Sequence, residues 1–521
     1  MAGSPSRADV DALASALAEV RAWPEVAPGT DVRWIQTHIS HVFLVGERVF
    51  KLRKDVRLPF LDFGSRQRRN EDCVRELTLN RRLAPDVYRG IAPIVRDGAS
   101  VRVDAIREPP IDLDAEHFVV MRRLPEGCDA LSMLEAGRLE PRHLDATAER
   151  LVRFHAEHGL GSPAPWSPDE GFERIREPVT ACVTALREAK SLEPARLEAI
   201  DAAVDARLAT LRPRFEARRR AGCAVDGHGD LHLDHVWFER AEGEPLMIDC
   251  IEFDSELRRI DRASEVAFLA MDLRYRDAED LAEAFLHAYA CRADDYDLFE
   301  TVDFYTAYRA LVRAKVASVA AGQASIDAAQ QARARHSVEA HVALAESLLA
   351  PPKQGGVVVV CGTVGSGKST VALAMARAGE GIPVASDRVR KALAGIPATA
   401  HPESGTDQGL YRPEQTDRVY EAMLERALPI VGSGRTVILD ASHATRARRD
   451  RVRAWAGQLG LAVRLVEVRC DPGIARVRLH EREQRGDDAS DAGPALLETS
   501  LRRFEPPDEW PAATREVVWS S

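Results

Sequence analysis

The chain has 521 residues, of which 45% are hydrophobic and 29% are charged. This composition is typical of a globular protein with enough apolar material for two or three domains. The formal net charge of −11 argues against broad, sequence-independent nucleic-acid binding, because such binding needs a basic surface.

Three features of the sequence point to the cytoplasm. No apolar run approaches the roughly 18 residues of a membrane span. The first residues, MAGSPSRADV, lack the basic and apolar segments of a secretory signal. The eight cysteines form no CxxC pair, which favours buried thiols in a reducing compartment. We therefore expect a cytoplasmic protein.

The first part of the chain begins with alternating helical and strand-like stretches. Residues 8–22 predict a short amphipathic helix, and residues 31–55 predict two strands joined by a turn at Gly46. A charged helical pattern follows at 65–83, and HFVVM at 117–121 predicts another strand.

Helical patterns dominate the next part of the chain. Residues 142–220 are rich in Ala, Arg, Glu and Leu, and helices are expected to fill 262–350. Between these regions lie a loop-like segment, DGHGDLHLDHVWF, and a short strand, PLMIDCIEF. The two segments concentrate polar side chains next to apolar ones.

A change of pattern marks a domain boundary. The segment PPKQGG reads as a linker, and an apolar strand, VVVVCG, follows it. Strand and helix patterns then alternate to about residue 505, which predicts a parallel sheet covered by helices. We therefore predict a domain at 1–350, a linker at 351–356 and an α/β domain at 357–521, as a fusion of unlike domains.

The segment GTVGSGKS fits the phosphate-binding pattern GxxxxGK[ST], the P-loop or Walker A motif, at every fixed position. It follows a buried strand and opens a helix, which is the context that the motif requires. Its backbone N–H groups and the helix N-terminus attract phosphate, Lys368 is expected to reach the β- and γ-phosphates, and Ser369 is expected to ligate Mg²⁺. The predicted nucleotide-binding residues of this loop are Gly362, Thr363, Val364, Gly365, Ser366, Gly367, Lys368, Ser369 and Thr370.

Two acidic residues downstream stand where a P-loop kinase needs them. Asp387 follows the short strand IPVA and is a candidate to accept the proton of a substrate hydroxyl; alternatively it caps the helix that follows. Asp440 ends the strand VILD and is a candidate to hold Mg²⁺; alternatively it is only a residue of the turn.

Three arginines lie on the stretch RVRLHEREQR. The spacing of Arg478, Arg482 and Arg485 places the first two on one helix face and the third nearby. They form either a lid that neutralises transferring phosphate or an ordinary solvated face.

The C-terminal segments resemble the small kinases of the P-loop superfamily related to gluconate kinase, zeta toxins, chloramphenicol phosphotransferase and the kinase part of polynucleotide kinase. The resemblance covers roughly residues 356–510. The chain has neither an NKxD-like guanine motif nor an LSGGQ-like signature. GTPases and ABC transporters are therefore disfavoured, and ATP is the expected nucleotide.

A second set of candidate residues lies in the N-terminal domain. Lys51 stands inside an apolar strand, where an ammonium group needs a partner, and Glu76 on the next helix is the best candidate. Asp230 follows in the loop HGDLHLDH, and Asp249 follows a short strand. A base on a loop and then a metal-binding aspartate is how kinase-like folds build phosphoryl transfer.

The segments HGDLH and IDCIEFD resemble those of aminoglycoside and choline kinase-like phosphotransferases. VFLVGERVFKLRK and RELTLNRRLAPDVY resemble fused proteins in which such a domain precedes an ATP-binding domain, over nearly the whole chain. The resemblance implies a protein-kinase-like α+β fold. It also implies that Asp230 is the catalytic base, Asp249 a Mg²⁺ ligand, and Lys51 an α/β-phosphate contact held by Glu76.

The sequence departs from this family at one metal position. The family commonly has asparagine five residues after the base, whereas this chain has His235. Imidazole is a poorer Mg²⁺ ligand than an amide or carboxylate oxygen. The N-terminal domain is therefore expected to use one metal, with His235 as a possible ligand, or to have weak or lost kinase activity.

A zinc-hydrolase interpretation of the same loop is less satisfactory. DLHLDH contains HxDH, close to the HxHxDH motif of metallo-β-lactamase-like hydrolases. However, Asp230 stands where that motif has histidine, and Lys51 and the IDCIEF segment are left unexplained.

These features predict an ATP- and Mg²⁺-dependent kinase acting on a small hydroxylated metabolite, such as a sugar, an aminosugar or an antibiotic. A second hypothesis is a nucleotide-dependent regulator, in which one domain binds ATP without transferring phosphate. A third is a polynucleotide 5′-hydroxyl kinase, but an acidic chain with 6% aromatic residues does not favour a cationic, base-stacking channel.

Overall fold

The computed structural model describes residues 7–23, 26–27, 30–58, 61–97, 100–112, 114–240, 243–322, 327–396, 412–485 and 494–520. Packing divides the chain into two compact units. The first unit holds residues 1–164 and 222–265, and the second holds residues 165–221 and 266–521. The domain boundary at 351–356 stays a prediction, because a division by packing does not test it.

The first unit contains a six-stranded antiparallel sheet in the order β1-β2-β3-β8-β6-β7. The predicted hairpin is present, because β2 and β3 pair across a turn at Gly46, whose φ of +57° suits glycine. The strands of this sheet are β1 (Val32–Gln36), β2 (Ser40–Val45), β3 (Arg48–Arg53), β6 (Tyr88–Asp97), β7 (Ser100–Val103) and β8 (Glu116–Arg122).

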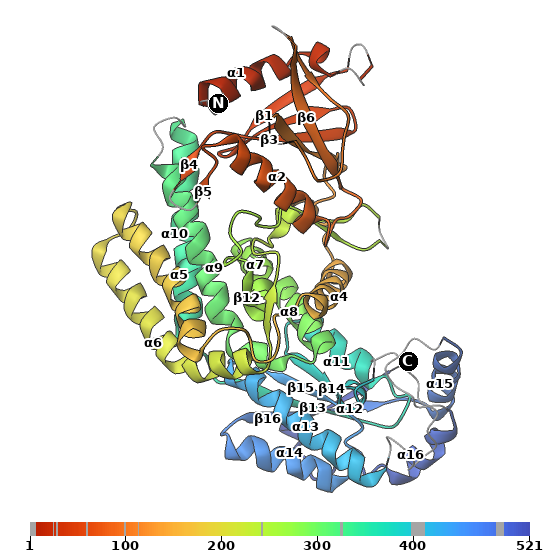
Figure 1. The fold of residues 1–521 in the computed structure, drawn as a ribbon. Helices are drawn as coiled ribbons and strands as arrows, with labels where there is room; N and C mark the ends of the chain where they lie inside the picture. Colours follow the sequence, from red (N-terminus) through yellow and green to blue (C-terminus); the bar gives the residue numbers. More distant parts are fainter. Residues whose placement is uncertain are drawn as a thin grey trace. The chain divides into compact units, whose positions relative to one another are not determined.

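Helices and short strands complete the first unit, and α2 lies along one face of the sheet (Figure 1). The helices are α1 (Arg7–Leu17), α2 (Arg66–Asn80), α3 (Ala130–Glu135) and α4 (Pro141–Glu157). The short strands are β4 (Arg57–Leu58), β5 (Leu61–Asp62), β9 (Ala224–Asp226), β10 (Val236–Trp237), β11 (Leu246–Met247) and β12 (Arg259–Asp261).

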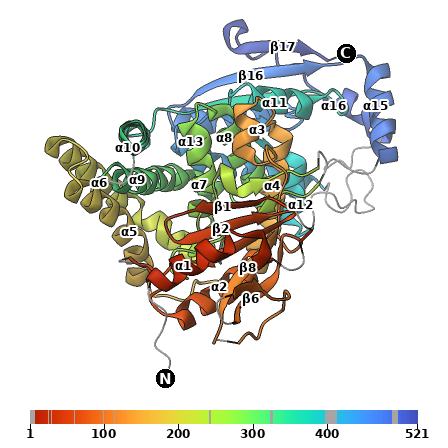
Figure 2. The same ribbon diagram turned by 90° about the horizontal axis from the view of Figure 1, so that it is seen from above.

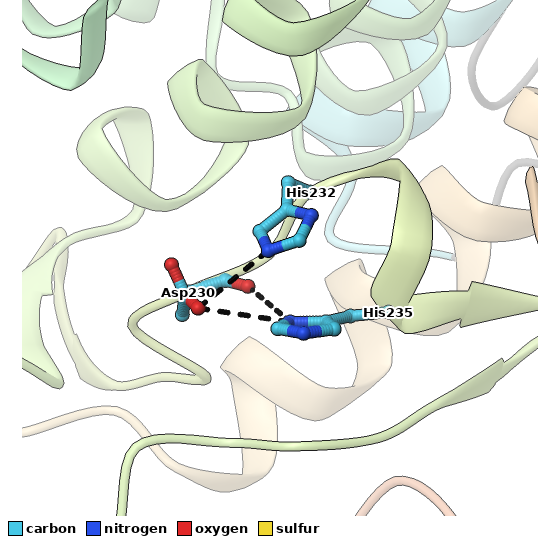
Figure 3. Close-up of side chains that lie close together, drawn as sticks. All are labelled: Asp230, His232 and His235. Atoms are coloured by element: carbon cyan, nitrogen blue, oxygen red, sulfur yellow. Dashed lines mark hydrogen bonds and ion pairs between the residues drawn. The ribbon is translucent and has the colours of Figure 1, made fainter. Parts of the chain in front are cut away.

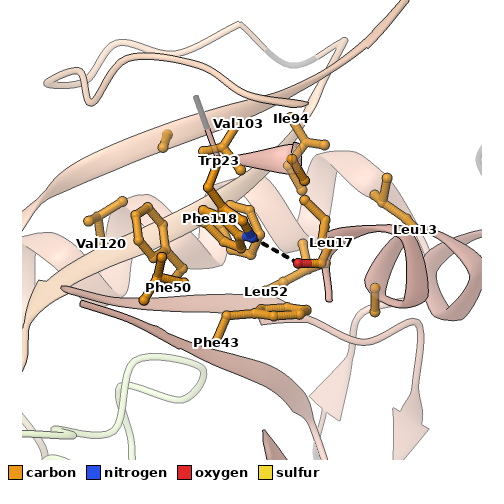
Figure 4. Packing of buried hydrophobic residues seen from close by; sticks show 14 of the residues in the cluster. Leu13, Leu17, Trp23, Phe43, Phe50, Leu52, Ile94, Val103, Phe118 and Val120 are labelled. Carbon is orange, nitrogen blue, oxygen red and sulfur yellow. Dashed lines mark hydrogen bonds between the residues drawn. The ribbon is translucent and has the colours of Figure 1, made fainter. Parts of the chain in front are cut away.

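An aromatic core fills the face of the sheet away from α2 (Figure 4). Trp23 lies at its centre, with ring centroids 4.6 Å from Phe50 and 5.6 Å from Phe118. The Trp23 indole N–H donates to the Leu17 carbonyl at 2.9 Å, so its polar atom is satisfied. Because side chains alternate along a strand, the residues between these core positions point toward α2.

The second unit contains a five-stranded sheet in the order β14-β15-β13-β16-β17, and every neighbouring pair is parallel. Figure 2 shows β16 and β17 side by side. The sheet confirms the predicted parallel α/β arrangement. Its strands are β13 (Gly356–Cys361), β14 (Ile382–Ala385), β15 (Val437–Asp440), β16 (Ala462–Arg469) and β17 (Arg515–Trp519).

Helices flank this sheet and extend the second unit. Those between the strands are α11 (Lys368–Arg377), α12 (Ser386–Leu393), α13 (Pro413–Gly432), α14 (Arg446–Gln458), α15 (Pro472–Arg485) and α16 (Leu497–Arg503). Those before the sheet are α5 (Pro168–Glu188), α6 (Pro194–Arg220), α7 (Arg262–Tyr275), which starts in the first unit, α8 (Glu279–Ala293), α9 (Val302–Ala321) and α10 (Ala328–Leu349). None of the helices within the described ranges is long and apolar enough to cross a membrane.

A buried ion cluster joins the parallel sheet to α8 and α9. The guanidinium of Arg435, which stands just before β15, binds Glu283 on α8 and Asp303 on α9 at 2.7–2.9 Å. Arg274 approaches Asp303 at 3.1 Å, so two cations face two carboxylates. Arg435 also lies over the ring of Phe299. Both charge and packing therefore hold the helices against the sheet.

Candidate active sites

The first site is built on β3. Phe50 and Leu52 point into the aromatic core, so Lys51 and Arg53 point to the opposite face, toward α2. The Lys51 ammonium lies 2.9 Å from Glu76 Oε1 and 2.8 Å from Asp249 Oδ1. The structure therefore brings together three residues that the sequence singled out.

The charges of this trio stabilise one another. Burial alone lowers the pKa of Lys51, but Asp249 and Glu76 outweigh it and raise the pKa. Burial likewise disfavours the ionised Asp249, yet Lys51 holds the pKa of this carboxyl well below its usual range. Both groups are therefore charged at neutral pH, as phosphate and metal binding require.

Backbone geometry also singles out Asp249. Its φ of +63° lies in the left-handed region, which is uncommon for a residue other than glycine. The Asp249 N–H donates to the hydroxyl of Tyr88 at 3.1 Å, which helps to hold this conformation. Strained conformations of this kind gather at functional sites.

Arg53 is a buried cation that sequence reasoning missed. Its guanidinium binds Asp72 at 2.7 Å, Glu76 at 2.6 Å and the Ser40 hydroxyl at 3.0 Å, and it also pairs with Glu252. Burial raises the pKa of Glu252 to about 8. The spacing of two from Lys51 on an apolar strand was the available signal, because it places both cations on one face.

The loop that carries Asp230 is held by a buried carboxylate. The N–H of His228 donates to Glu265 Oε1 at 2.7 Å, and the N–H of Gly229 donates to Glu265 Oε2 at 3.1 Å. Glu265 lies in the first turn of α7 and was not predicted. The ring of His228 donates through Nε2 to the Ile248 carbonyl at 2.8 Å, which ties the loop to the segment before Asp249. Burial lowers the pKa of His228 to about 3, so its ring is neutral.

Asp230 lies beside two histidines (Figure 3). Its Oδ2 is 3.6 Å from His232 Nε2 and 3.8 Å from His235 Nδ1. One ligand atom from each of these three residues lies within 4.8 Å of the others, a grouping able to hold a metal ion. His235 Nε2 in turn lies 3.7 Å from Asp249 Oδ2. Burial lowers the pKa of His235, and His232 adds to this effect.

The second site is the phosphate loop between β13 and α11. Gly367 has φ +86° and precedes Lys368, the first residue of α11. A Cβ atom at Gly362 would lie 2.4 Å from the Val468 carbonyl oxygen, so only glycine fits there. The buried Ser366 hydroxyl has no hydrogen-bond partner among the described residues. Ser369 and Thr370 are exposed in the first turn of α11. A tight loop at a helix N-terminus fits a phosphate group.

Lys368 lies at the centre of the second site. Its ammonium donates to the Thr363 carbonyl of the same loop at 2.7 Å. Burial lowers the pKa of Lys368, whereas the nearby carboxylates of Asp440 and Asp387 oppose this shift. Arg482 also acts on Lys368 and lowers its pKa. Charged residues of β15, α12 and α15 therefore lie close enough to the lysine of the loop to shift its pKa.

Asp387 does not cap α12. The N-cap is Ala385, which makes no side-chain capping bond, and Asp387 lies within the first turn of the helix. The alternative prediction of a capping aspartate is wrong, because α12 begins at Ser386, two residues earlier than a cap at Asp387 needs. The carboxylate of Asp387 is therefore left for another role.

Helix α15 brings the predicted lid arginines to the loop. Arg478 Nη1 donates to the Ser520 hydroxyl at 2.7 Å, and Ser520 donates to the Ser366 carbonyl at 2.7 Å. Ser520 follows β17, and nothing in its sequence surroundings signalled this contact. Arg485 ends α15, and its side chain lies outside the described part of the structure.

The buried His443 beside the phosphate loop makes stability depend on pH. Its Nδ1–H donates to the Val360 carbonyl at 2.8 Å, and burial lowers the pKa of His443 to about 4. A histidine with a lowered folded-state pKa loses stability as the pH falls below its unfolded value near 6.5. We expect about 2 kcal/mol of this loss between pH 7 and pH 5.

The test compares His443 with a side chain that does not titrate. Asparagine can donate to the same carbonyl and tolerates the φ of +38° at this position. Hydrogen exchange of β13 and β15 amides at pH 7 and pH 5 measures local stability. The His443→Asn variant should lose about 2 kcal/mol less than the wild type; an equal loss would show that His443 does not titrate in this window.

Two family models match the chain. The model of the Phosphotransferase enzyme family matches residues 46–305, and the model of an AAA domain matches residues 357–507. The matches confirm the predicted order, a kinase-like phosphotransferase domain followed by a P-loop domain. The chain is therefore a phosphotransferase enzyme.

Relatives that match most of the chain show which family of phosphotransferases it belongs to. An uncharacterized protein of Mycobacterium tuberculosis is 34% identical over 449 residues, which cover 86% of this chain and 84% of the relative. An uncharacterized protein of Mycobacterium bovis matches equally. The chain belongs to the same family as these mycobacterial proteins.

Two solved structures resemble the chain weakly. A gluconokinase from Sinorhizobium meliloti 1021 is 25% identical with a TM-score of 0.23 and covers 32% of this chain and 83% of its own. A Plasmodium vivax ethanolamine kinase is 12% identical with a TM-score of 0.35 and covers 61% of this chain and 83% of its own. TM-scores this low do not establish a shared fold, so the fold assignment rests on the family models and the strand order.

Proposed function

We propose that this phosphotransferase is an ATP- and Mg²⁺-dependent kinase that phosphorylates a hydroxyl group of a small metabolite of the sugar, aminosugar or antibiotic class. The observation that carries the proposal is the surroundings of Lys368. Asp387 and Asp440 act on this lysine from two further elements, beside a loop shaped for phosphate.

Each candidate residue of the second unit has a proposed role in binding ATP and Mg²⁺. The backbone N–H groups of residues 362–370 bind the phosphates of ATP, and Lys368 balances their charge. Ser369 and Asp440 hold Mg²⁺, which neutralises charge on the phosphates when bound. Arg478 and Arg482 add positive charge from α15.

Asp387 supplies the proton acceptor in this scheme. It orients the hydroxyl of the acceptor and takes its proton as the oxygen attacks phosphorus. A bond forms between the acceptor oxygen and the γ-phosphorus, and the bond between that phosphorus and ADP breaks. Most of the acceleration comes from positioning and charge neutralisation, because this reaction needs little covalent help from the protein.

The first unit offers a second set of residues for the same chemistry. Lys51, held by Glu76, contacts the α- and β-phosphates of a nucleotide. Asp249 binds a metal ion together with His235, and Asp230 accepts the proton of an acceptor hydroxyl. The pairing of Lys51 with Glu76 and Asp249 supports these roles.

The experiment is a measurement of ATP consumption with sugars, aminosugars, aminoglycosides, nucleosides and 5′-hydroxyl oligonucleotides as acceptors. We expect one acceptor class to stimulate turnover. Lys368→Ala should then lower kcat/KM at least about 100-fold, because it removes a preorganised charge. Lys353→Ala, an exposed lysine of the linker, is the matched control and should stay near the wild type.

A parallel Asp230→Ala variant shows which unit transfers the phosphate. If Asp230→Ala abolishes stimulated turnover and Lys368→Ala does not, the transfer occurs in the first unit. If no acceptor class stimulates ATP consumption, the kinase proposal fails.

A second candidate function is a nucleotide-dependent regulator whose first unit binds ATP without transferring phosphate. The position of His235 beside Asp249 favours it, because an imidazole replaces the usual amide ligand at this metal position. In that case Lys51→Met should abolish ATP binding by the first unit, whereas Asp230→Ala should leave turnover unchanged.

A further inference from the structure

The tautomer of His235 is fixed by a single hydrogen bond. Its Nδ1 lies 2.8 Å from the backbone carbonyl oxygen of Asp230. A carbonyl oxygen only accepts hydrogen bonds, so Nδ1 carries the proton and Nε2 carries the lone pair. A hydrogen bond from Nδ1 to a backbone carbonyl is also the usual way in which a metal-binding histidine is oriented.

The lone pair of His235 faces a carboxylate. Nε2 is 3.7 Å from Asp249 Oδ2, too far for a hydrogen bond, and Asp249 Oδ1 is already bound by Lys51 at 2.8 Å. The His235 ring stacks on His232 with centroids 3.9 Å apart, and Tyr88 holds the backbone of Asp249. Two electron-pair donors therefore face each other in fixed positions, an arrangement that a cation between them stabilises.

The distance between these donors suits some metals better than others. Two ligand atoms at about 2.1 Å from a metal lie about 3.4 Å apart at a tetrahedral angle and about 3.0 Å apart at the octahedral angle that Mg²⁺ demands. The observed 3.7 Å is closer to the tetrahedral value. Imidazole nitrogen also suits zinc, copper, iron and nickel better than magnesium, which prefers oxygen ligands.

We propose that His235 and Asp249 form a site for a divalent transition-metal ion, which binds there in preference to Mg²⁺. The inference rests on the proposed function, since Asp249 is the metal ligand assigned above for the first unit. The first unit then has a nucleotide site whose metal ion differs from the Mg²⁺ proposed for the phosphate loop.

The neighbouring group of Asp230, His232 and His235 is a less suitable place for the ion. The ring nitrogen of His235 that approaches Asp230 Oδ2 is Nδ1, at 3.8 Å, but this nitrogen carries the proton and cannot ligate. A metal there would require His235 to give up its bond to the Asp230 carbonyl. The two positions can be distinguished by substitution, because only an ion at the Asp230 group would depend on His232.

The test uses untagged full-length protein, without nucleotide or acceptor, titrated with Co²⁺ and followed by the visible absorption of the bound ion. We expect Co²⁺ to bind the wild type with a nitrogen-ligated spectrum and to resist displacement by a tenfold excess of Mg²⁺. His235→Asn should weaken Co²⁺ binding at least about tenfold, since it replaces the imidazole nitrogen with an amide oxygen, which suits transition metals less well and Mg²⁺ better. The matched control, His232→Asn, should change the affinity less than twofold.

Other outcomes would overturn the assignment. Equal Co²⁺ affinity of the wild type and His235→Asn would do so, and so would loss of binding in His232→Asn, which would place the ion at the Asp230 group. Displacement of Co²⁺ by the tenfold excess of Mg²⁺ would remove the proposed selectivity. If His235→Asn does not fold, Asp249→Asn removes the negative charge of the other ligand and should weaken Co²⁺ binding at least as much. Because no turnover is measured, failure of the kinase proposal leaves this test unaffected.

Discussion

Replacing Arg435 with alanine should lower the free energy of unfolding of the second unit by about 3–5 kcal/mol. The substitution leaves the carboxylates of Glu283 and Asp303, whose side chains are 20% and 19% exposed, with Arg274 as their remaining buried cation. Removing one member of a buried ion cluster is far more costly than losing a surface pair, because the remaining charges cannot regain water. Hydrogen exchange of amides in α8 and α9 measures the loss locally.

Arg426 provides the matched control for this prediction. It also binds a carboxylate of the second unit through two nitrogens, but Asp294 is 38% exposed. Arg426→Ala should therefore cost about 1 kcal/mol or less. If the two alanine variants destabilise α8 and α9 equally, burial of the cluster around Arg435 does not have the proposed effect.

Replacing Arg53 with methionine should destabilise the first unit by about 3–5 kcal/mol at pH 8. Arg53 binds Asp72, Glu76 and Glu252, and its side chain is 1% exposed. Methionine fills similar space but leaves these carboxyls without their cation. Because protonation relieves the repulsion between them, the loss should shrink as the pH falls toward 5. Hydrogen exchange of β2 and β3 amides at the two pH values reports it.

Arg75 is the control for Arg53, since it approaches the same carboxylate from solvent. Its Nη2 lies 3.3 Å from Asp72 Oδ1, and its side chain is 47% exposed. Arg75→Met should cost less than about 1 kcal/mol. A loss at Arg53 that does not depend on pH would mean that lost packing, rather than unpaired carboxyls, destabilises the variant.

Local patterns were enough to predict much of the fold. The hairpin at Gly46 and the strand around Lys51 follow from alternating apolar residues and a turn glycine. The parallel sheet follows from strands that alternate with helices. The phosphate loop has so many fixed positions that its placement before α11 followed from the sequence alone.

Contacts between distant segments could not be predicted in this way. Arg435 is separated from Glu283 by about 150 residues, and in the sequence each resembles a residue of a solvated face. The tautomer of His235 likewise could not be predicted from the sequence. It depends on the hydrogen bond between the ring and the backbone carbonyl of Asp230, five residues earlier. Burial of a charge is decided by its partners, and spacing along the chain does not reveal them.

The hydrogen bonds of Ser520 have a practical consequence for work on this protein. This residue links the Ser366 carbonyl of the phosphate loop to Arg478, so any polypeptide that continues after it begins next to the candidate ATP site. A histidine tag or fusion partner added at this end would bring foreign charge and metal ligands to the loop.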